Sequence, residues 1–294
     1  MSWRAARILR VPLTVSVVWA ILAVTIPIAM TQYFPFIVRP SIACLSTAQL
    51  ASGASRLACR SLAEIYHLSF PSLFVESTFR SLALLVGAAT LALIIGTLLG
   101  VAAALLRRRA FASGGIVGLT TLLAAVPAFF VAYFLQIVVI LIGATPEGGR
   151  LLPVFGFGYD EHLVLPLLSI SLPAITFTAQ LTATRMAEVL DSDFITTANA
   201  KGLRTGWILA VHVLPHVRPV LLEALGSGLR VSVASLPIVE YLFQWRGIGQ
   251  LALEAVGVRD AAAFVFSAVV IAALFTTLSA IADLSRPRAL YRAS

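Results

Sequence analysis

The amino-acid sequence predicts an all-α integral membrane protein with six transmembrane helices. Its 294 residues are 60% apolar and only 12% charged. A soluble domain is usually about 45–50% apolar and about 25% charged. The apolar residues are also collected in long stretches, and the mean hydropathy is +0.98. These observations exclude a water-soluble globular protein.

Six apolar stretches are each long enough to cross a membrane. About 20 helical residues span a hydrocarbon core of about 30 Å. The stretches lack the alternation of β-strands, and a helix satisfies its backbone polar groups internally, as lipid requires. The predicted spans are Val11–Met30, Phe79–Leu106, Gly115–Gly143, Leu163–Thr184, Pro219–Tyr241 and Ala261–Leu284.

The first stretch also resembles a secretory signal peptide, because Arg4, Arg7 and Arg10 precede it. Its apolar run is longer than a usual signal-peptide core, and residues 33–36 (Tyr-Phe-Pro-Phe) do not form a small-residue cleavage site. We therefore expect it to be retained as a span.

Basic residues set the orientation, because cytoplasmic loops carry an excess of Lys and Arg. With the N-terminus inside, the cytoplasmic segments hold 13 basic residues in 61 positions and the outer segments hold 7 in 89. Both termini are therefore expected in the cytoplasm, and the Arg107–Arg109 triplet is interpreted as a topological anchor. The net charge of +8 is attributed to this topology and not to nucleic-acid binding.

The spans divide the chain into two parts. Residues 1–78 are predicted to form the first transmembrane helix and an extracytoplasmic loop, and residues 79–294 a core of five transmembrane helices. A long cytoplasmic loop, residues 185–218, separates the fourth and fifth spans. A protein that only conducts needs no such loop, so we expect a partner to bind there.

A short helix is predicted inside this loop. Residues 191–193 (Asp-Ser-Asp) suit a helix N-terminus, and Lys201 followed by Gly202 suits its end. Phe194 and Ala198 are four residues apart and share one face. Because so short a helix is marginal alone in water, we expect it to dock against the rest of this chain or another protein.

Several motifs resemble the permease subunits of binding-protein-dependent ABC importers. Residues 193–202 (Asp-Phe-Ile-Thr-Thr-Ala-Asn-Ala-Lys-Gly) are similar to the Asp-Tyr-x-x-Thr-Ala-x-Ala-Lys-Gly loop of the peptide-transport branch. Residues 212–215 (His-Val-Leu-Pro) stand where the family loop ends in an Ile-x-Leu-Pro-like sequence. The glutamate of the family's Glu-Ala-Ala start is missing, since Thr196 takes its place.

A second motif lies near the predicted outer end of the fifth span. Residues 240–251 (Glu-Tyr-Leu-Phe-Gln-Trp-Arg-Gly-Ile-Gly-Gln-Leu) resemble Glu-x-x-Phe-x-Trp-Pro-Gly-Leu-Gly-x-Leu, with Arg246 where proline is usual. The prolines of residues 163–173 and the Arg-Pro-Arg at 286–288 also match that branch. The resemblance covers roughly residues 76–288, and the long outer loop is like the dipeptide/oligopeptide B-type permease.

The resemblance implies a type I ABC importer permease core in the prokaryotic inner membrane. The implied cargo is di- or oligopeptides delivered by an extracytoplasmic binding protein. The implied partners are a second, C-type permease, two ATPase domains and membrane lipid, with ATP and Mg²⁺ on the ATPases and no cofactor on this chain. The alternatives are nickel, glutathione or haem as cargo, or a secondary transporter that works alone.

The same resemblance implies that the predicted short helix is a coupling helix seated in an ATPase cleft. Phe194 and Ala198 would supply apolar packing there. The implied coupling residues are Asp193, Phe194, Thr197, Ala198, Asn199, Lys201, Gly202 and Arg204. The sequence contains no Gly-x-x-x-x-Gly-Lys-Ser/Thr loop. We therefore expect the partner subunits to hydrolyse the ATP.

Four polar residues are candidates for a translocation path. Arg230 lies near the middle of the fifth span, where a charge costs at least about 2.5–3.5 kcal/mol on insertion scales, so it should face water or a partner. Glu223 lies two turns earlier on that helix. Gln136 and Gln180 are weaker candidates, because such residues often serve as interhelical hydrogen-bond donors. A purely structural pairing of Arg230 is left open.

Small residues recur at every fourth position of the second span: Ala88, Ala92, Gly96, Gly100 and Ala104. This small-residue stripe permits close approach of another helix, more naturally one of this chain than of a second permease.

Two cysteines, Cys44 and Cys59, lie in the predicted extracytoplasmic loop, where a disulfide or two free thiols are possible. His212 and His216 have a zinc-compatible spacing but no third ligand, so no metal site is predicted. A membrane enzyme is disfavoured, since no acid/base cluster is found.

Overall fold

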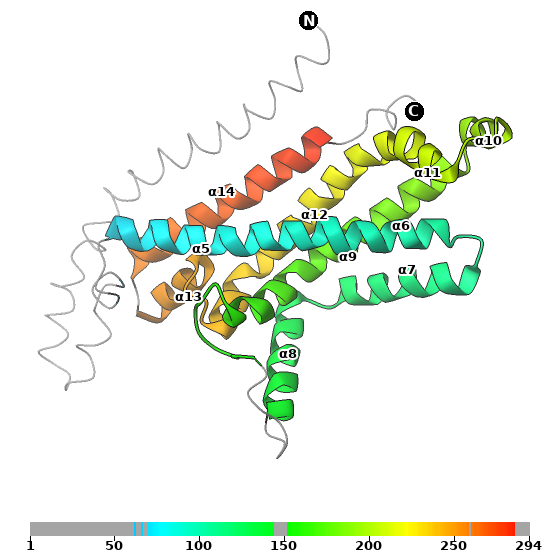
Figure 1. Ribbon diagram of the computed structural model, residues 1–294. Coiled ribbons are helices and arrows are strands. Elements are labelled where there is room, and N and C mark those ends of the chain that lie inside the picture. Colours follow the sequence, from blue (N-terminus) through cyan, green and yellow to red (C-terminus); the bar gives the residue numbers. More distant parts are fainter. Residues whose placement is uncertain (1–61, 63–65, 67–69, 144–151, 259, 286–294) are drawn as a thin grey trace, which may run out of the picture.

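The computed structural model describes residues 62, 66, 70–143, 152–258 and 260–285, and within them every regular element is a helix (Figure 1). The helices are α5 (Phe70–Leu91), α6 (Thr97–Leu105), α7 (Ala110–Ala125), α8 (Ala128–Gly143), α9 (Val164–Leu190), α10 (Asp193–Ala200), α11 (Thr205–Trp207), α12 (Leu214–Phe243), α13 (Ile248–Val258) and α14 (Ala261–Ser285). π-Helical turns at Ala92–Gly96 and Ile208–Val213 join α5 to α6 and α11 to α12.

Four continuous helices are long and apolar enough to cross a membrane. They are Ser72–Leu105, Glu161–Leu190, Thr205–Phe243 and Ala263–Asp283, and they stand where the second, fourth, fifth and sixth spans were predicted. The predicted first span and most of the outer loop lie outside the described residues, as do Cys44 and Cys59.

The predicted third span, Gly115–Gly143, is not one straight helix. It consists of α7 and α8, which are bent by 97° at the break. The break falls at Val126 and Pro127. Proline has no N–H to donate, and it disfavours the helical conformation of the preceding residue, so Val126 is extended with φ −88° and ψ 121°. In Figure 1, α7 runs back beside α6 and α8 then leaves steeply.

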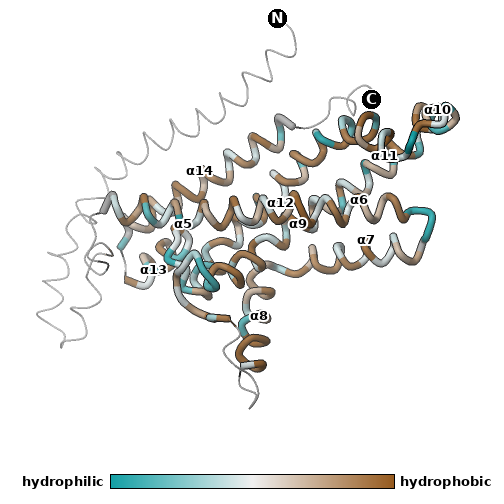
Figure 2. Tube along the Cα trace, in the orientation of Figure 1, coloured by the Kyte–Doolittle hydropathy of each residue, from teal (hydrophilic) through white to brown (hydrophobic). Residues whose placement is uncertain are grey.

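The loop between the fourth and fifth spans is shorter than predicted. The fourth span continues as α9 to Leu190, and the fifth begins as a continuous helix at Thr205, so only residues 191–204 separate the two. Residues 185–190 and 205–218, which were predicted as parts of the loop, are helical, because polar side chains do not by themselves end a helix. Figure 2 shows hydrophilic residues at the α6–α7 turn and near α10.

Helix α9 forms the centre of the bundle. Its most apolar window is 61% buried, against 11–28% for the other three continuous spans. Helix α12 packs along it, and Ser232 on α12 donates a hydrogen bond to the carbonyl of Ile170 at 2.7 Å. Gly228 lies where a Cβ would meet the α9 backbone at Ala174. Close approach of these two helices therefore depends on small side chains.

The small-residue stripe packs against α9, as predicted. A Cβ on Gly96 would lie 2.7 Å from the carbonyl oxygen of Ile175. A Cβ on Gly100 would lie 2.6 Å from the carbonyl oxygen of Ala179. Both distances are shorter than side chains tolerate, so only glycine permits this contact.

Candidate functional site

The short helix α10 lies where the sequence predicts it, and Gly202 ends it. Gly202 has a φ of 72°, the left-handed conformation that glycine adopts without strain. Its N–H donates to the carbonyl of Asn199 at 2.9 Å, and the N–H of Leu203 donates to the carbonyl of Ala198 at 3.3 Å. This pair of bonds is the Schellman motif, which satisfies the last carbonyls of a helix.

One face of α10 is buried against the rest of the chain. Ile195 and Ala198 are 3% and 6% exposed. They join a small apolar cluster with Ala104, Met186, Val189, Ile208, Val213 and Val217 from α6, α9 and the start of the fifth span. Ala198 therefore packs within this chain, which corrects the expectation that it packs against another protein. Residue 198 shares its inward face with residue 195 and not with residue 194.

The other predicted coupling residues lie on the exposed side of α10 or just after it. They are Asp193, Phe194, Thr197, Asn199, Lys201, Gly202 and Arg204. This surface combines one aromatic ring with one acidic and two basic side chains. It is a small, chemically varied surface that another protein can contact.

A salt bridge fixes the start of α10 to the second span. Arg107, two residues after α6, donates from Nε and Nη2 to one carboxylate oxygen of Asp191 at 3.1 and 2.9 Å. The same guanidinium reaches the carbonyl of Ala104 at 3.4 Å. The interpretation of Arg107 as an anchor was therefore incomplete, since it also holds the segment that leads into α10.

A ring contact fixes α10 to the fifth span. Phe194 stacks on His216 of α12 with a centroid distance of 5.4 Å and an interplanar angle of 30°. The His216 Nδ1 lies 2.7 Å from the carbonyl oxygen of His212. The two histidines therefore interact through one backbone carbonyl, and the described residues contain no group of three metal-ligating side chains.

The four candidates for the translocation path do not converge on one site. Arg230 is half-buried on α12 and donates to the hydroxyl of Ser227, one turn away, at 2.9 Å. Glu223 is also half-buried on α12. No ion pair of Arg230 occurs among the described residues. A role of Arg230 and Glu223 in the path therefore stays a prediction.

The two glutamines differ in their surroundings. Gln136 on α8 is 5% exposed and donates to the carbonyl of Leu242 at 2.9 Å. It therefore holds α8 to the end of α12, which corrects its assignment to the path. Gln180 on α9 is half-buried, and its Nε2 has no hydrogen-bond partner in the described part of the chain. Of the two, Gln180 is the one with a fully enclosed polar atom that lacks a partner in the described part of the chain.

The motif at residues 240–251 forms a closed junction at the end of the bundle opposite α10 (Figure 1). Glu240 is fully buried. Its carboxylate accepts a hydrogen bond from the Ser81 hydroxyl at 2.5 Å and from the N–H groups of Gly249 and Gln250 at 2.8 and 3.1 Å. These N–H groups belong to the first turn of α13, whose unpaired donors attract an anion. Glu240 thus joins α12, α5 and α13.

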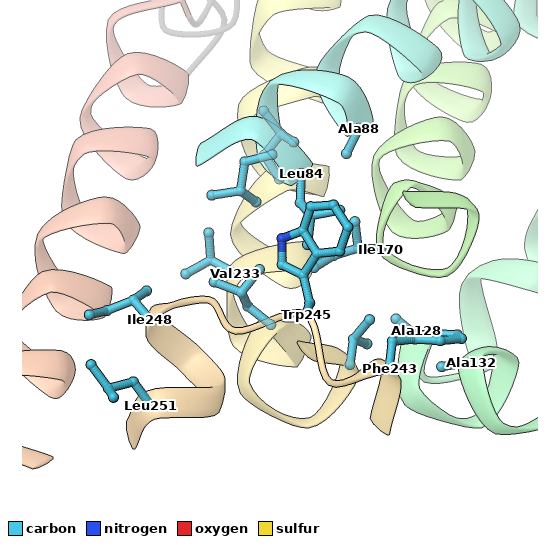
Figure 3. Packing of buried hydrophobic residues seen from close by; sticks show 14 of the residues in the cluster. Leu84, Ala88, Ala128, Ala132, Ile170, Val233, Phe243, Trp245, Ile248 and Leu251 are labelled. Carbon is cyan, nitrogen blue, oxygen red and sulfur yellow. The ribbon is translucent and has the colours of Figure 1, made fainter. Parts of the chain in front are cut away.

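A tight turn before α13 buries Trp245. Gln244 and Arg246 have φ values of 55° and 58°, which residues other than glycine seldom adopt. Trp245 is 0% exposed, and its indole N–H donates to the carbonyl of Arg80 at 3.1 Å. Figure 3 shows its ring among Leu84, Ile170 and Val233. Proline is usual at position 246 in the resembled motif, and its φ is fixed near −65°. With Arg246 the backbone therefore adopts a φ that proline cannot reach.

Three contacts were missed from the sequence: Arg107 with Asp191, Phe194 with His216, and Ser81 with Glu240. Each joins residues that lie in or next to different helices. Glu240 carried a signal, because its spacing to two glycines was part of the second motif. Ser81 carried none, since one serine in an apolar helix is ordinary.

The described residues define a class: a helical membrane protein with a short helix packed on one end of its bundle. Residues 96–291 match the family of binding-protein-dependent transport system inner membrane components, and the chain belongs to this family. It is therefore an inner membrane protein.

Relatives of this chain include bacterial permeases. A Brucella ovis protein described as a peptide permease is 29% identical over 209 residues, which cover 70% of this chain and 65% of the relative. The dipeptide transport system permease protein DppB of Bacillus subtilis is 31% identical over 173 residues, or 59% of this chain and 54% of that protein. The matched region thus spans less than two thirds of each relative.

A solved structure has the same fold. A chain of the MetNI methionine ABC transporter, in an inward-facing conformation, superposes with a TM-score of 0.57 at 16% identity. The match covers 75% of this chain and 100% of that chain. The predicted all-α permease core of the type I ABC importers is thereby confirmed, whereas the count of six spans and the placement of both termini stay predictions.

Proposed function

We propose that this chain is the membrane-spanning permease subunit of an ATP-driven importer for di- and oligopeptides. An extracytoplasmic binding protein delivers the peptide, two ATPase domains bind ATP and Mg²⁺, and a second, C-type permease completes the path. The family of this chain and the peptide permeases among its relatives support the proposal. This chain contributes the path and the helix that the ATPases move.

The observation that carries the proposal is the construction of α10. The helix has eight residues, too few for stability alone in water. Its inward face is packed on α6, α9 and the fifth span. Its outward face displays Phe194, which is 43% exposed. A force applied to this face passes directly into three membrane-spanning helices.

The proposed mechanism has two states. When ATP closes the two ATPases, they displace α10. Because the Arg107–Asp191 salt bridge and the Phe194–His216 stack hold α10 to the spans, the spans follow, and the path changes from inward-open to outward-open. ATP bound elsewhere thereby biases a bistable bundle.

Uptake of a labelled mixture of di- and tripeptides tests the proposal. The assembled transporter would be reconstituted in proteoliposomes with its binding protein outside and ATP inside. We expect uptake that requires ATP. Uptake by this chain alone, without ATPases, would contradict the proposal and favour a secondary transporter.

The substitution Phe194→Asp tests the role of α10 in the same assay. A charge in place of the ring should abolish uptake while the chain still inserts in the membrane. The matched variant Phe194→Leu keeps an apolar side chain and should retain most of the uptake. Wild-type uptake by Phe194→Asp would remove α10 from the mechanism.

A further inference from the structure

A small cavity opens at the end of the bundle opposite α10, between α5 and α13. It has a volume of about 130 Å³ and is lined by Tyr66, Leu73, Ser77, Arg80, Arg246, Gly247, Gln250 and Leu251. Pockets for drug-sized ligands are about 300–1,000 Å³. The cavity therefore has room for one small polar group and a few waters, and not for a whole peptide.

The two arginines that line the cavity differ in how their charge is balanced. Arg80 donates to the carboxylate of Glu76 at 2.8 Å and lies 4.4 Å above the centre of the Phe157 ring. The guanidinium of Arg246 makes no hydrogen bond or ion pair with any described residue. Arg246 is exposed, so its guanidinium is free to meet a group that enters the cavity from solvent.

The main chain of Arg246 is held in place although its side chain is free. Its N–H donates to the side-chain oxygen of Gln250 at 2.6 Å, and its carbonyl accepts from Arg80 at 3.4 Å. The residue has a φ of 58°. Such backbone strain persists only where surrounding contacts maintain it, and it is concentrated at ligand sites. The fold thus fixes the position of Arg246 relative to the cavity.

The acidic residue beside the cavity is already engaged. Glu254 accepts from the Tyr66 hydroxyl at 2.6 Å and from the Gln250 side-chain amide at 2.6 Å. Burial and the bond to Glu254 raise the pKa of Tyr66, so its hydroxyl stays protonated and keeps donating. Both carboxylate oxygens of Glu254 therefore have donors other than Arg246.

A second polar group lines the cavity without a partner. Ser77 is 2% exposed, and its hydroxyl makes no hydrogen bond within the described residues. Ser77 lines the cavity, and its oxygen is not among the fully enclosed side-chain atoms that lack a partner in the described residues. The hydroxyl is therefore open to the cavity and can donate a hydrogen bond to a group that enters it.

We propose that this cavity is a carboxylate-binding site, in which Arg246 and Ser77 donate hydrogen bonds to one carboxylate group. A planar guanidinium matches the two oxygens of a carboxylate, and such charge-assisted bonds are the strong ones. The source of the carboxylate rests on the proposed function: it is either the terminus of a peptide substrate or an acidic side chain of the docked binding protein.

Protection of Arg246 from an arginine reagent tests this site without measuring transport. The full chain in lipid nanodiscs would be treated with phenylglyoxal, and modification of each arginine followed by mass spectrometry. The probes are N-acetylalanine, which has only a terminal carboxylate, and N-acetylaspartic acid α-methylamide, which has only a side-chain carboxylate. N-Acetylalanine amide and sodium chloride at equal ionic strength are the controls.

We expect at least one carboxylate probe to protect Arg246, while the two controls do not. Arg108, which is exposed at the other end of the bundle, should remain unprotected. The variant Ser77→Ala should weaken protection about three- to tenfold, the loss expected for one hydrogen bond. If N-acetylalanine alone protects Arg246, the natural ligand is the terminus of a peptide. If the aspartate probe alone protects it, the natural ligand is an acidic side chain. Protection by both probes shows that the site accepts a carboxylate from either source.

The site is overturned if neither carboxylate protects Arg246 more than chloride does, if Arg108 is protected equally, or if Ser77→Ala changes nothing. Because no ATP, partner or uptake enters this measurement, its failure is distinct from a failure of the proposed importer function.

Discussion

The two ends of the bundle are built in different ways. At the α13 end, Glu240 and Trp245 are fully buried, and their hydrogen bonds connect three helices. At the α10 end, a short helix rests on one small apolar cluster. There the Arg107–Asp191 salt bridge is partly open to solvent, with side-chain exposures of 24% and 67%.

This difference indicates that the two ends serve different purposes. Buried, hydrogen-bonded polar groups are costly to separate, so the α13 end should move as one unit. Exposed salt bridges contribute little to stability, so the α10 end can shift without unfolding the bundle. A fixed junction at the α13 end and a more loosely held helix at the α10 end suit a protein that is driven from one side.

The largest effect is expected at the fixed junction. In Gly247→Ala, the new Cβ would overlap the carboxylate of Glu240, so the carboxylate would lose its bonds to Ser81 and α13. Leaving a buried charged group without its donors costs about 3–5 kcal/mol. We expect a large fall in the thermal unfolding temperature, measured by far-ultraviolet circular dichroism.

The control for this prediction is Gly257→Ala on α13, where a Cβ meets nothing within 4 Å. Equal unfolding temperatures for Gly247→Ala and the wild type would show that the junction is not closed as described.

The next largest effect is expected in the small-residue stripe. Gly100→Leu places a side chain where even a Cβ would be 2.6 Å from the carbonyl oxygen of Ala179. Such overpacking costs about 1–3 kcal/mol. Gly118→Leu on α7 is the matched control, because a Cβ there meets nothing within 4 Å. Thermal unfolding in detergent should separate the two variants, and similar curves for both would argue against a tight α6–α9 contact.

A smaller and local effect is expected at the end of α10. Gly202→Ala forces alanine into a φ of 72°, which should cost about 1 kcal/mol or more. Gly206→Ala, within a helix and with space for its Cβ, should instead be neutral or slightly stabilising. Hydrogen exchange of the α10 amides is the measurement. Faster exchange in Gly206→Ala than in Gly202→Ala would contradict the described end of α10.

The smallest effect on stability is expected for the salt bridge of the α10 end. Arg107→Ala and Asp191→Ala should each change the free energy of unfolding by less than about 1 kcal/mol. Each should nevertheless reduce ATP-driven peptide uptake, because α10 loses one attachment to the spans. The exchanged pair Arg107→Asp with Asp191→Arg should restore part of the uptake. If the exchanged pair is as defective as the single variants, the two charges do not act together.

Much of the fold could be predicted from the sequence, because it follows from local signals. Apolar length located the spans, and the left-handed preference of glycine located the end of α10 at Gly202. The break at Pro127 also has a local signal, but apolar composition continues through it, so hydropathy alone predicts one span there. Hydropathy could not reveal that α9 continues to Leu190 or that the fifth span begins at Thr205.

The contacts of the candidate site were less predictable, because they depend on how helices pack. Residues 107 and 191 are 84 positions apart, and residues 81 and 240 are 159 apart. The inward orientation of Ala198 also depended on its neighbours, since spacing alone allowed Phe194 to share its face. Gln136 illustrates the same limit. The sequence pattern around a polar residue in a span is the same whether that residue lines a path or forms a hydrogen bond with a neighbouring helix.

A photo-cross-link tests most directly whether an ATPase holds α10. The exposed residue Thr197 on α10 would be replaced by p-benzoylphenylalanine, and the same group at Arg108 on the α6–α7 turn would serve as the control. In the assembled transporter, we predict that position 197 cross-links to an ATPase subunit and that position 108 does so much less. Cross-links from position 197 only to this chain or to lipid would contradict the account.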